Sequence, residues 1–213
     1  LFPLEMETGN VRKALSLIAQ YGFGVTVITK SSRVLRDIGL LKKINETAKC
    51  VVQMTLTTFD DGLCRKIEPN VSPTSERFET LKRLHDAGIP TVVWLTPILP
   101  YINDTAENIS GLLELCAEAK VRGVVNFGMG LTLREGNRAY FYQQLDRLYP
   151  GLKEQYIQIY GNQYIVNSPK NGELSALFHQ RCEAAGLAHD NGQIFQYLST
   201  FEDQSEKMQL RLF

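Results

Sequence analysis

The sequence has 213 residues, of which 44% are hydrophobic and 22% are charged, as is ordinary for a globular domain with one core. Basic and acidic residues number 23 each, so the net charge is zero and no overall positive field favours nucleic acid or an acidic membrane. No apolar run approaches the roughly 18 residues of a membrane span, and the N-terminal LFPLEMETGN is no signal peptide. We therefore expect a soluble, cytoplasmic protein.

Strands and helices are predicted to alternate along the first part of the chain. Short apolar runs rich in β-branched residues predict strands buried on both faces at Phe23–Thr29, Val51–Thr57, Ile89–Leu95 and Val124–Phe127. Apolar residues at helical spacing predict helices at Asn10–Tyr21, Val34–Thr47, Glu76–Ala87 and Thr105–Lys120. This alternation is the βαβ repeat of a parallel α/β sheet.

Two features favour a barrel over an open doubly wound sheet. Polar residues such as Lys30, Thr55 and Thr96 follow the predicted strand ends, where a βα barrel carries its active site. No dinucleotide fingerprint follows a strand, because Gly128-Met129-Gly130 has incomplete spacing. A complete barrel has eight strands in about 250 residues, so we expect a partial parallel βα barrel of the TIM type that lacks its first strands.

The chain is expected to form one domain, with βα units over residues 1–130 and a mostly helical part over 131–213. The later elements are predicted as a polar loop at Leu131–Arg138, helices at Ala139–Tyr149 and Ser168–Gly186, and an amphipathic stretch from Asn191. A weak strand is also predicted at Tyr156–Tyr160, in a stretch that reads as either a short helix or a strand.

The cysteines and histidines show no pattern of a metal site. The cysteines are Cys50, Cys64, Cys116 and Cys182, and no pair has the CxxC spacing. We expect buried free thiols and no disulfide framework. The histidines are His85, His179 and His189, which lack acidic or cysteine partners at ligand spacing, so no residue is assigned to a metal.

Several polar residues are candidates for a site, each with a plain alternative. Lys30 would bind a carboxylate or phosphate at the mouth of the sheet, or form a Schiff base, unless it is a solvated loop residue. Glu68, before Pro69, is either rigidly placed or a salt-bridged surface group, and Glu5 alone reads as a surface carboxylate. Thr55 shares a strand face with Thr57 and there could bind a polar ligand.

The sequence also resembles a known family. The segments TKSSRVLRDIGLLKKIN, TLTTFDDGLCRKIEPNVSPTSERFETLKRLHDAGIP, TPILPYINDTAENI and FGMGLTLREGNRAYFYQQL resemble, in this order, the spore photoproduct lyase-like branch of the radical S-adenosylmethionine proteins. Many members of this branch are labelled DNA repair photolyases. The resemblance covers nearly the whole chain.

The resemblance implies cofactor-binding roles for four residues. Glu5 would contact the amino group of the methionine moiety, at the end of a stretch that closes a barrel strand in the family. Lys30 would bind the carboxylate of S-adenosylmethionine, and Thr55 would lie near the same ligand. Glu68-Pro69 matches a Glu-Pro of the family. The catalytic residues are not assigned.

The sequence departs from the family in one respect that concerns the cofactor. A radical S-adenosylmethionine enzyme holds a [4Fe–4S] cluster by CxxxCxxC, and no three cysteines of this sequence approach that spacing. In the family this motif lies upstream of the part that matches this chain. The resemblance therefore implies the C-terminal portion of a longer enzyme, inactive by itself, whose intact form makes a 5′-deoxyadenosyl radical.

Other functions stay open at this point. The chain would also suit an aldolase-type barrel with Lys30 as the Schiff-base residue, or a non-catalytic binding module. The expected partner is S-adenosylmethionine. The neutral net charge does not support nucleic acid, although the family name suggests it.

Overall fold

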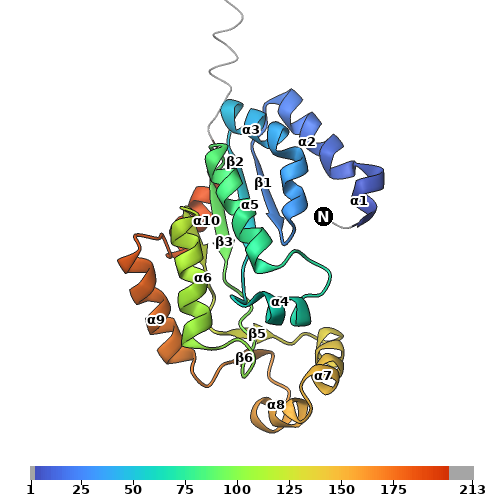
Figure 1. Ribbon diagram of the computed structural model, residues 1–213, viewed down its shortest axis with the longest axis vertical. Coiled ribbons are helices and arrows are strands. Elements are labelled where there is room, and N and C mark those ends of the chain that lie inside the picture. The colour runs from blue at the N-terminus through green and yellow to red at the C-terminus, as the bar shows by residue number, and fades with distance from the viewer. Residues whose placement is uncertain (1–2, 202–213) are drawn as a thin grey trace, which may run out of the picture.

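The structure is a computed structural model that describes residues 3–201. Helices and strands alternate as far as β4, and helices predominate thereafter (Figure 1). The elements are α1 (Pro3–Thr8), α2 (Asn10–Tyr21), β1 (Val25–Thr29), the 3-10 helix η1 (Ser32–Asp37), α3 (Ile38–Thr47), β2 (Cys50–Thr55), α4 (Asp61–Ile67), α5 (Thr74–Asp86), β3 (Thr91–Trp94), α6 (Ala106–Glu118), β4 (Gly123–Val125), β5 (Gly130–Thr132), α7 (Asn137–Leu148), α8 (Leu152–Tyr160), β6 (Ile165–Asn167), α9 (Asn171–Ala184) and α10 (Asn191–Ser199).

The first four strands form one parallel sheet in the order β1-β2-β3-β4. Val27 lies opposite Val52 on β2, and Val93 of β3 lies opposite Val124 on β4. Consecutive strands are therefore neighbours in space, as βαβ units require. The predicted series of four strands with helices between them is confirmed.

One face of this sheet is buried beneath the helices that connect the strands. Val52 and Met54 of β2 belong to the same apolar core as Leu41 of α3, Leu84 of α5 and Leu112 of α6. All five side chains have no exposed surface. The main core thus lies between the sheet and the helices α3, α5 and α6, which cover one face in Figure 1.

The opposite face is covered only in part by the described residues. Val51, Val92 and Val125 pack against Ile194 and Leu198 of α10. Nearer β1 and beyond β4, however, apolar side chains remain in solvent, because Ile28 is 61% exposed and Phe127 is 60% exposed. Parallel sheets normally have both faces covered, so this face has room for further structure.

The elements from β5 to β6 form a smaller unit, in which these two strands pair antiparallel, whereas α9 and α10 pack on the main sheet and its helices. The core of the smaller unit contains Tyr156 and Val166, and the Tyr156 hydroxyl donates to the Pro100 carbonyl at 2.8 Å. Helix α7 confirms the helix predicted at Ala139–Tyr149, and α9 confirms the one predicted at Ser168–Gly186.

Three predictions of local structure are wrong. Tyr156–Tyr160 belongs to α8 and not to a strand, because Tyr156 and Tyr160 are one helical turn apart and both face the same core. The predicted loop Leu131–Arg138 begins within β5, which pairs with β6. Glu5 lies in α1, so the end of a strand that the family resemblance implied is absent there.

Side-chain caps begin three of the α-helices among residues 3–201. Asp60, Thr105 and Asp190 each accept a hydrogen bond from the backbone N–H three residues later, which satisfies one unpaired donor in the first turn of α4, α6 and α10. At the other end of α2, Gly22 has φ 71°, a left-handed conformation that favours glycine. Among residues 3–201, no helix has the length and apolar character needed to cross a membrane.

Candidate functional site

Lys30 and Glu68 meet at the carboxyl edge of the parallel sheet. Lys30 follows β1 directly, and Glu68 follows the short helix α4 and precedes Pro69. The Lys30 ammonium donates a hydrogen bond to the Glu68 carboxylate and forms an ion pair with it. The structure therefore brings together two residues that the family resemblance assigned to one ligand.

Arg77 of α5, which the sequence analysis missed, connects this ion pair to the sheet. Its side chain has no exposed surface, and it donates to Glu68 Oε2 at 2.7 Å. It also donates to the Thr55 carbonyl at 2.9 Å and to the Ser72 carbonyl at 2.6 Å. A buried guanidinium needs such partners, and these come from β2, from the residue that follows α4 and from the loop before α5.

The position of Arg77 in its helix is the signal that could have revealed it. One buried stripe of α5 contains the residues Thr74, Arg77, Thr80, Leu81 and Leu84. An arginine in the apolar stripe of an amphipathic helix is rarely buried without a paired charge. Glu68, nine positions earlier, is that charge.

The carboxylate of Glu68 is held ionised by its two cations. Its side chain is 15% exposed. Burial by itself would raise the pKa of this carboxyl, but the charges of Lys30 and Arg77 and their hydrogen bonds outweigh burial and hold the pKa below its ordinary value. One carboxylate thus lies between two cations, and the three groups together carry one net positive charge.

Thr55 is the third predicted residue at this edge. It is the last residue of β2, is 7% exposed and reaches the ion pair through its carbonyl, which binds Arg77. The loop that follows is fixed by buried amides, because Asn103 and Asn108 both donate to the Thr57 carbonyl, at 2.8 and 3.0 Å. Side-chain hydrogen bonds therefore hold the backbone that follows Thr55.

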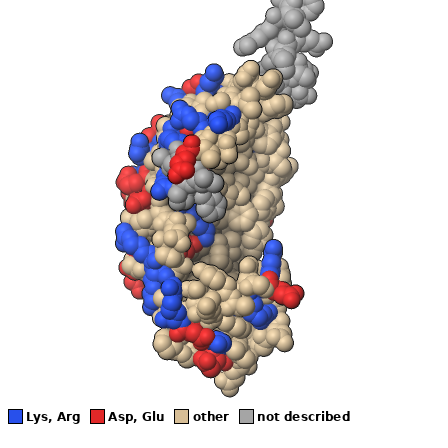
Figure 2. Space-filling view, turned by 90° about the vertical axis from the view of Figure 1, so that its right-hand side faces the viewer, with Lys and Arg blue, Asp and Glu red and all other residues tan. Residues whose placement is uncertain are grey.

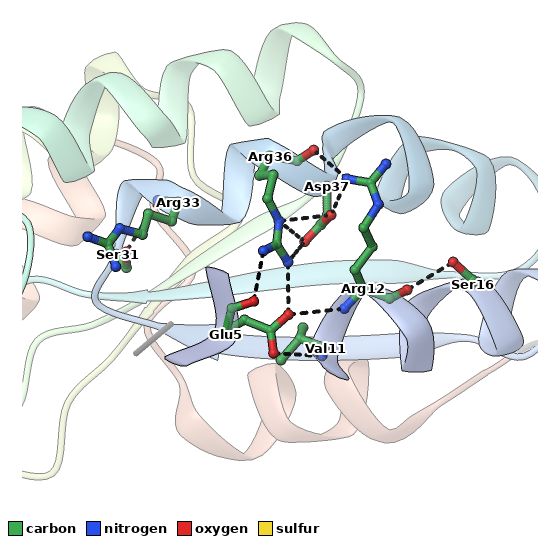
Figure 3. A network of polar contacts seen from close by, with 8 residues as sticks. All are labelled: Glu5, Val11, Arg12, Ser16, Ser31, Arg33, Arg36 and Asp37. Carbon is green, nitrogen blue, oxygen red and sulfur yellow. Dashed lines mark hydrogen bonds and ion pairs between the residues drawn. The ribbon is translucent and has the colours of Figure 1, made fainter. Parts of the chain in front are cut away.

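Glu5, the fourth predicted residue, lies in a different network (Figure 3). Its carboxylate accepts hydrogen bonds from the Val11 N–H at 2.9 Å and from Arg36 Nη2 at 2.9 Å. The Val11 hydrogen bond and the Arg36 interactions lower the pKa of Glu5 in spite of its burial. Asp37, with its side chain 1% exposed, binds Arg36 and also Arg12 at 3.0 Å.

This second network ties the start of α2 to η1. The structure does not join Glu5 to Lys30 or Glu68 by any hydrogen bond or ion pair among residues 3–201. Its carboxylate lies at the N-terminus of α2, where a negative charge complements the helix dipole.

The described residues offer no ligands for an iron–sulfur cluster. All four cysteines are free and buried, as the sequence predicted. Burial raises the pKa of the Cys50 thiol to about 12, and burial together with the nearby Glu183 does the same for Cys182. Since thiolates are the ligands, these side chains do not fit the role. Over residues 3–201, no three His, Cys, Asp or Glu side chains gather to hold a metal.

A pocket of about 320 Å³ opens beside Glu68. Thr57, Glu68, Pro69 and Pro97 form the part of its wall that belongs to the sheet edge, and α7 forms the opposite wall.

On the face shown in Figure 2, basic and acidic side chains are interspersed along one side, and a wide area next to them carries no charged side chain.

Comparison with known proteins gives relatives that are longer than this chain. No family model matches the sequence. An uncharacterized protein of Mycobacterium tuberculosis is 28% identical over 146 residues, which are 68% of this chain and 42% of the relative. An uncharacterized protein of Methanocaldococcus jannaschii is 31% identical over 105 residues, which are 48% of this chain and 38% of the relative. The chain thus spans well under half of each relative.

Comparison with solved structures defines the fold. Spore photoproduct lyase complexed with dinucleoside spore photoproduct superimposes with a TM-score of 0.61 at 15% identity, covering 87% of this chain and 56% of the lyase. A domain of pyruvate-formate lyase-activating enzyme from Bacteroides vulgatus gives a TM-score of 0.51 at 14% identity, covering 83% of this chain and 86% of that domain. The chain is a mixed α/β protein with a parallel four-stranded sheet, and this likeness shows the fold of a partial TIM-type barrel.

Proposed function

We propose that this chain is the part of a radical S-adenosylmethionine enzyme, similar to spore photoproduct lyase, that holds the carboxylate end of S-adenosylmethionine at Lys30. The observation that carries the proposal is the cluster of Lys30, Glu68 and Arg77, in which two cations face one carboxylate. The side chain of Lys30 is 36% exposed, whereas that of Arg77 has no exposed surface. The surplus positive charge is therefore accessible at Lys30.

The chemistry of Lys30 fits this role. An ammonium has three N–H donors, and Glu68 accepts one of them. The remaining donors can bind a second carboxylate, and the net charge of the cluster then falls to zero. Arg77 orients Glu68, and Glu68 in turn orients Lys30. This arrangement agrees with the cofactor-binding roles that the family resemblance implied for Lys30 and Glu68. Thr55 takes part through its carbonyl, which accepts a hydrogen bond from Arg77.

Glu5 is the weakest member of the proposed set. Its carboxylate oxygens are engaged by the Val11 N–H, the Arg12 N–H and Arg36, so contact with a methionine amino group would require exchange of these partners. The observed contacts favour a role in anchoring α2.

The cluster chemistry is assigned outside the described residues. A [4Fe–4S] cluster with one open iron would supply the electron that cleaves S-adenosylmethionine into methionine and a 5′-deoxyadenosyl radical. The buried cysteines of this chain do not fit as its ligands, so the proposal places them on the CxxxCxxC segment that the family carries upstream. The net charge of zero does not support nucleic acid as the substrate.

The proposal is tested by measuring S-adenosylmethionine binding to the purified chain by isothermal titration calorimetry. We expect Lys30→Met to weaken binding about tenfold, since charge-assisted hydrogen bonds contribute roughly 1.5–3 kcal/mol, and Lys30→Arg to retain part of it. Decarboxylated S-adenosylmethionine should bind wild type and Lys30→Met equally, because it lacks the group that Lys30 contacts.

Lys43→Met is the matched control, since Lys43 is exposed on α3 away from the site. Equal affinity of wild type and Lys30→Met for S-adenosylmethionine would contradict the proposal. Borohydride trapping of a carbonyl substrate on Lys30 would instead support the aldolase alternative. That reaction would require Lys30 to leave its ion pair with Glu68.

A further inference from the structure

The pocket beside Glu68 has the size and lining of a small-molecule site. Its volume of about 320 Å³ lies at the lower end of the range for ligand pockets, roughly 300–1,000 Å³. Leu99, Ile102 and Leu131 line one side, and Phe141, Leu145 and Tyr149 line another. The pocket is therefore largely apolar and includes aromatic rings. Such a surface suits a flat, apolar ligand.

The charged groups of the pocket favour an anion. Lys66 of α4 and Arg147 of α7 line it, and Glu68 is the acidic residue of its wall. The charge of Glu68 is already balanced by Lys30 and Arg77. Within residues 3–201, neither Lys66 nor Arg147 forms an ion pair with an acidic side chain. Two cations that lack an acidic partner among residues 3–201 thus line a largely apolar pocket.

Tyr149 adds a third, independent observation. Its hydroxyl is buried and has no hydrogen-bond partner among the described residues. Its ring lines the pocket and lies beneath the Lys66 ammonium, which is 3.9 Å from the ring centroid. A buried hydroxyl without a partner is costly, and an acceptor on a bound ligand would remove that cost.

We propose that this pocket binds a small aromatic anion, with the ring among the apolar side chains around Phe141 and Leu145 and the anionic group at Lys66 and Arg147. Of the cluster of Lys30, Glu68 and Arg77, the pocket is lined by Glu68 alone, and Lys30 does not line it. It is therefore a site separate from that of the proposed S-adenosylmethionine carboxylate. The inference goes beyond the proposed function and is tested without S-adenosylmethionine, so failure of one leaves the other intact.

The test compares 2-naphthoate with the neutral isostere 2-naphthamide, using the intrinsic fluorescence of each probe on the purified chain. We expect the acid to bind at least tenfold more tightly than the amide. Lys66→Gln and Arg147→Gln should each weaken binding of the acid about three- to tenfold and leave binding of the amide unchanged. Tyr149→Phe should weaken binding of the acid without lowering the melting temperature.

Two matched controls carry the same charge changes on other surfaces. Lys43→Gln on α3 and Arg181→Gln on α9 remove exposed cations that do not line the pocket, and both should bind the acid as wild type does. Equal affinity for acid and amide would overturn the proposal. So would an unchanged affinity of Lys66→Gln and Arg147→Gln, or no detectable binding of the acid.

Discussion

Arg77 occupies a position where an amphipathic helix normally carries an apolar side chain. Its guanidinium donates to three oxygen acceptors and to the Cys64 sulfur, and one of the oxygens belongs to a carboxylate that is itself largely buried. Removing one member of a buried ion pair leaves the other uncompensated and costs about 3–5 kcal/mol. We expect Arg77→Met to lower the free energy of unfolding by roughly 3 kcal/mol, at the low end because Lys30 still pairs with Glu68. Urea denaturation measures this change.

Arg83→Met is the control for Arg77→Met. Arg83 lies on the exposed side of the same helix, so the substitution should change the free energy of unfolding by less than about 0.5 kcal/mol. If the two variants have the same stability, Arg77 does not hold the site together in the way its contacts indicate.

The lowered pKa of Glu68 predicts a pH dependence of stability. Its folded-state pKa lies below the ordinary carboxyl value of about 4.3. Between these two values the unfolded chain binds more protons than the folded chain, so the contribution of Glu68 is present above about pH 4.3 and is lost as pH falls through the folded pKa. We expect Glu68→Gln to be less stable at pH 7 and to lose less stability on acidification. Denaturant titrations from pH 7 to pH 3 check this.

Glu79→Gln provides the comparison for Glu68→Gln. The side chain of Glu79 is 62% exposed, and its partner Lys82 is also exposed in part. This variant should follow the wild-type dependence on pH. A Glu68→Gln profile parallel to that of wild type would show that the carboxyl gains nothing from Lys30 and Arg77.

At the residue scale, the sequence singled out Lys30 and Glu68, which the structure joins in one ion pair, but it did not single out Arg77. Lys30 was accessible to prediction because it follows an apolar strand, and Glu68 because Pro69 stops a helix beside it. Arg77 was missed because its partners are the carbonyls of Thr55 and Ser72, which no local pattern brings near it. The partners of Glu5 depend on η1, which lies some thirty positions away.

Among the elements, α4 is the one that presents Glu68. It has only seven residues, and isolated helices of that length are unstable in water. The Asp60 carboxylate accepts from the Leu63 N–H at 2.6 Å and begins the helix. Loss of such a cap costs about 1 kcal/mol. We expect Asp60→Ala to lower the free energy of unfolding by that amount and to weaken S-adenosylmethionine binding severalfold.

Asp190→Ala removes an equivalent cap from another helix. Asp190 accepts from the Gln193 N–H at 2.7 Å at the start of α10, which packs against the sheet beside β4 and not against Lys30. Its loss of stability should match that of Asp60→Ala, whereas calorimetry should give wild-type affinity for S-adenosylmethionine. Equal loss of affinity in both variants would mean that general destabilisation, and not α4, controls binding.

The strands were predictable because continuous β-branched runs such as Val51–Val52 are buried on both faces of a parallel sheet. The stretch from Tyr156 to Tyr160 was not, because its aromatic and β-branched residues favour a strand by propensity. Tertiary packing overrides that preference. Tyr156 and Tyr160 are buried on one side of α8, while Ile157 and Ile159 are 47% and 45% exposed on the other.

For the whole molecule, the exposed sheet face and the buried cysteines both agree with a proposal in which the cluster ligands lie outside the described residues. One sheet face leaves Ile28 and Phe127 largely exposed, and the Mycobacterium tuberculosis relative has more than twice the length that matches here. Further structure would cover this face and, under the proposed function, supply the cluster ligands. All four thiols of this chain lie instead within its interior.

The cysteines therefore give the last prediction. With native protein, 5,5′-dithiobis(2-nitrobenzoate) should react slowly or not at all, and after denaturation all four thiols should react. Anaerobic incubation with iron and sulfide should give this chain no stoichiometric cluster absorbance, because all four thiols are buried and burial raises the pKa of Cys50, Cys116 and Cys182. A protein extended upstream through a CxxxCxxC motif should take up a cluster, and Cys50→Ser and Cys182→Ser in that protein should not reduce its iron content. Iron uptake by this chain that is lost on replacing its cysteines would show instead that the interior thiols rearrange to bind metal, and the proposed assignment of the cluster to an upstream segment would be wrong.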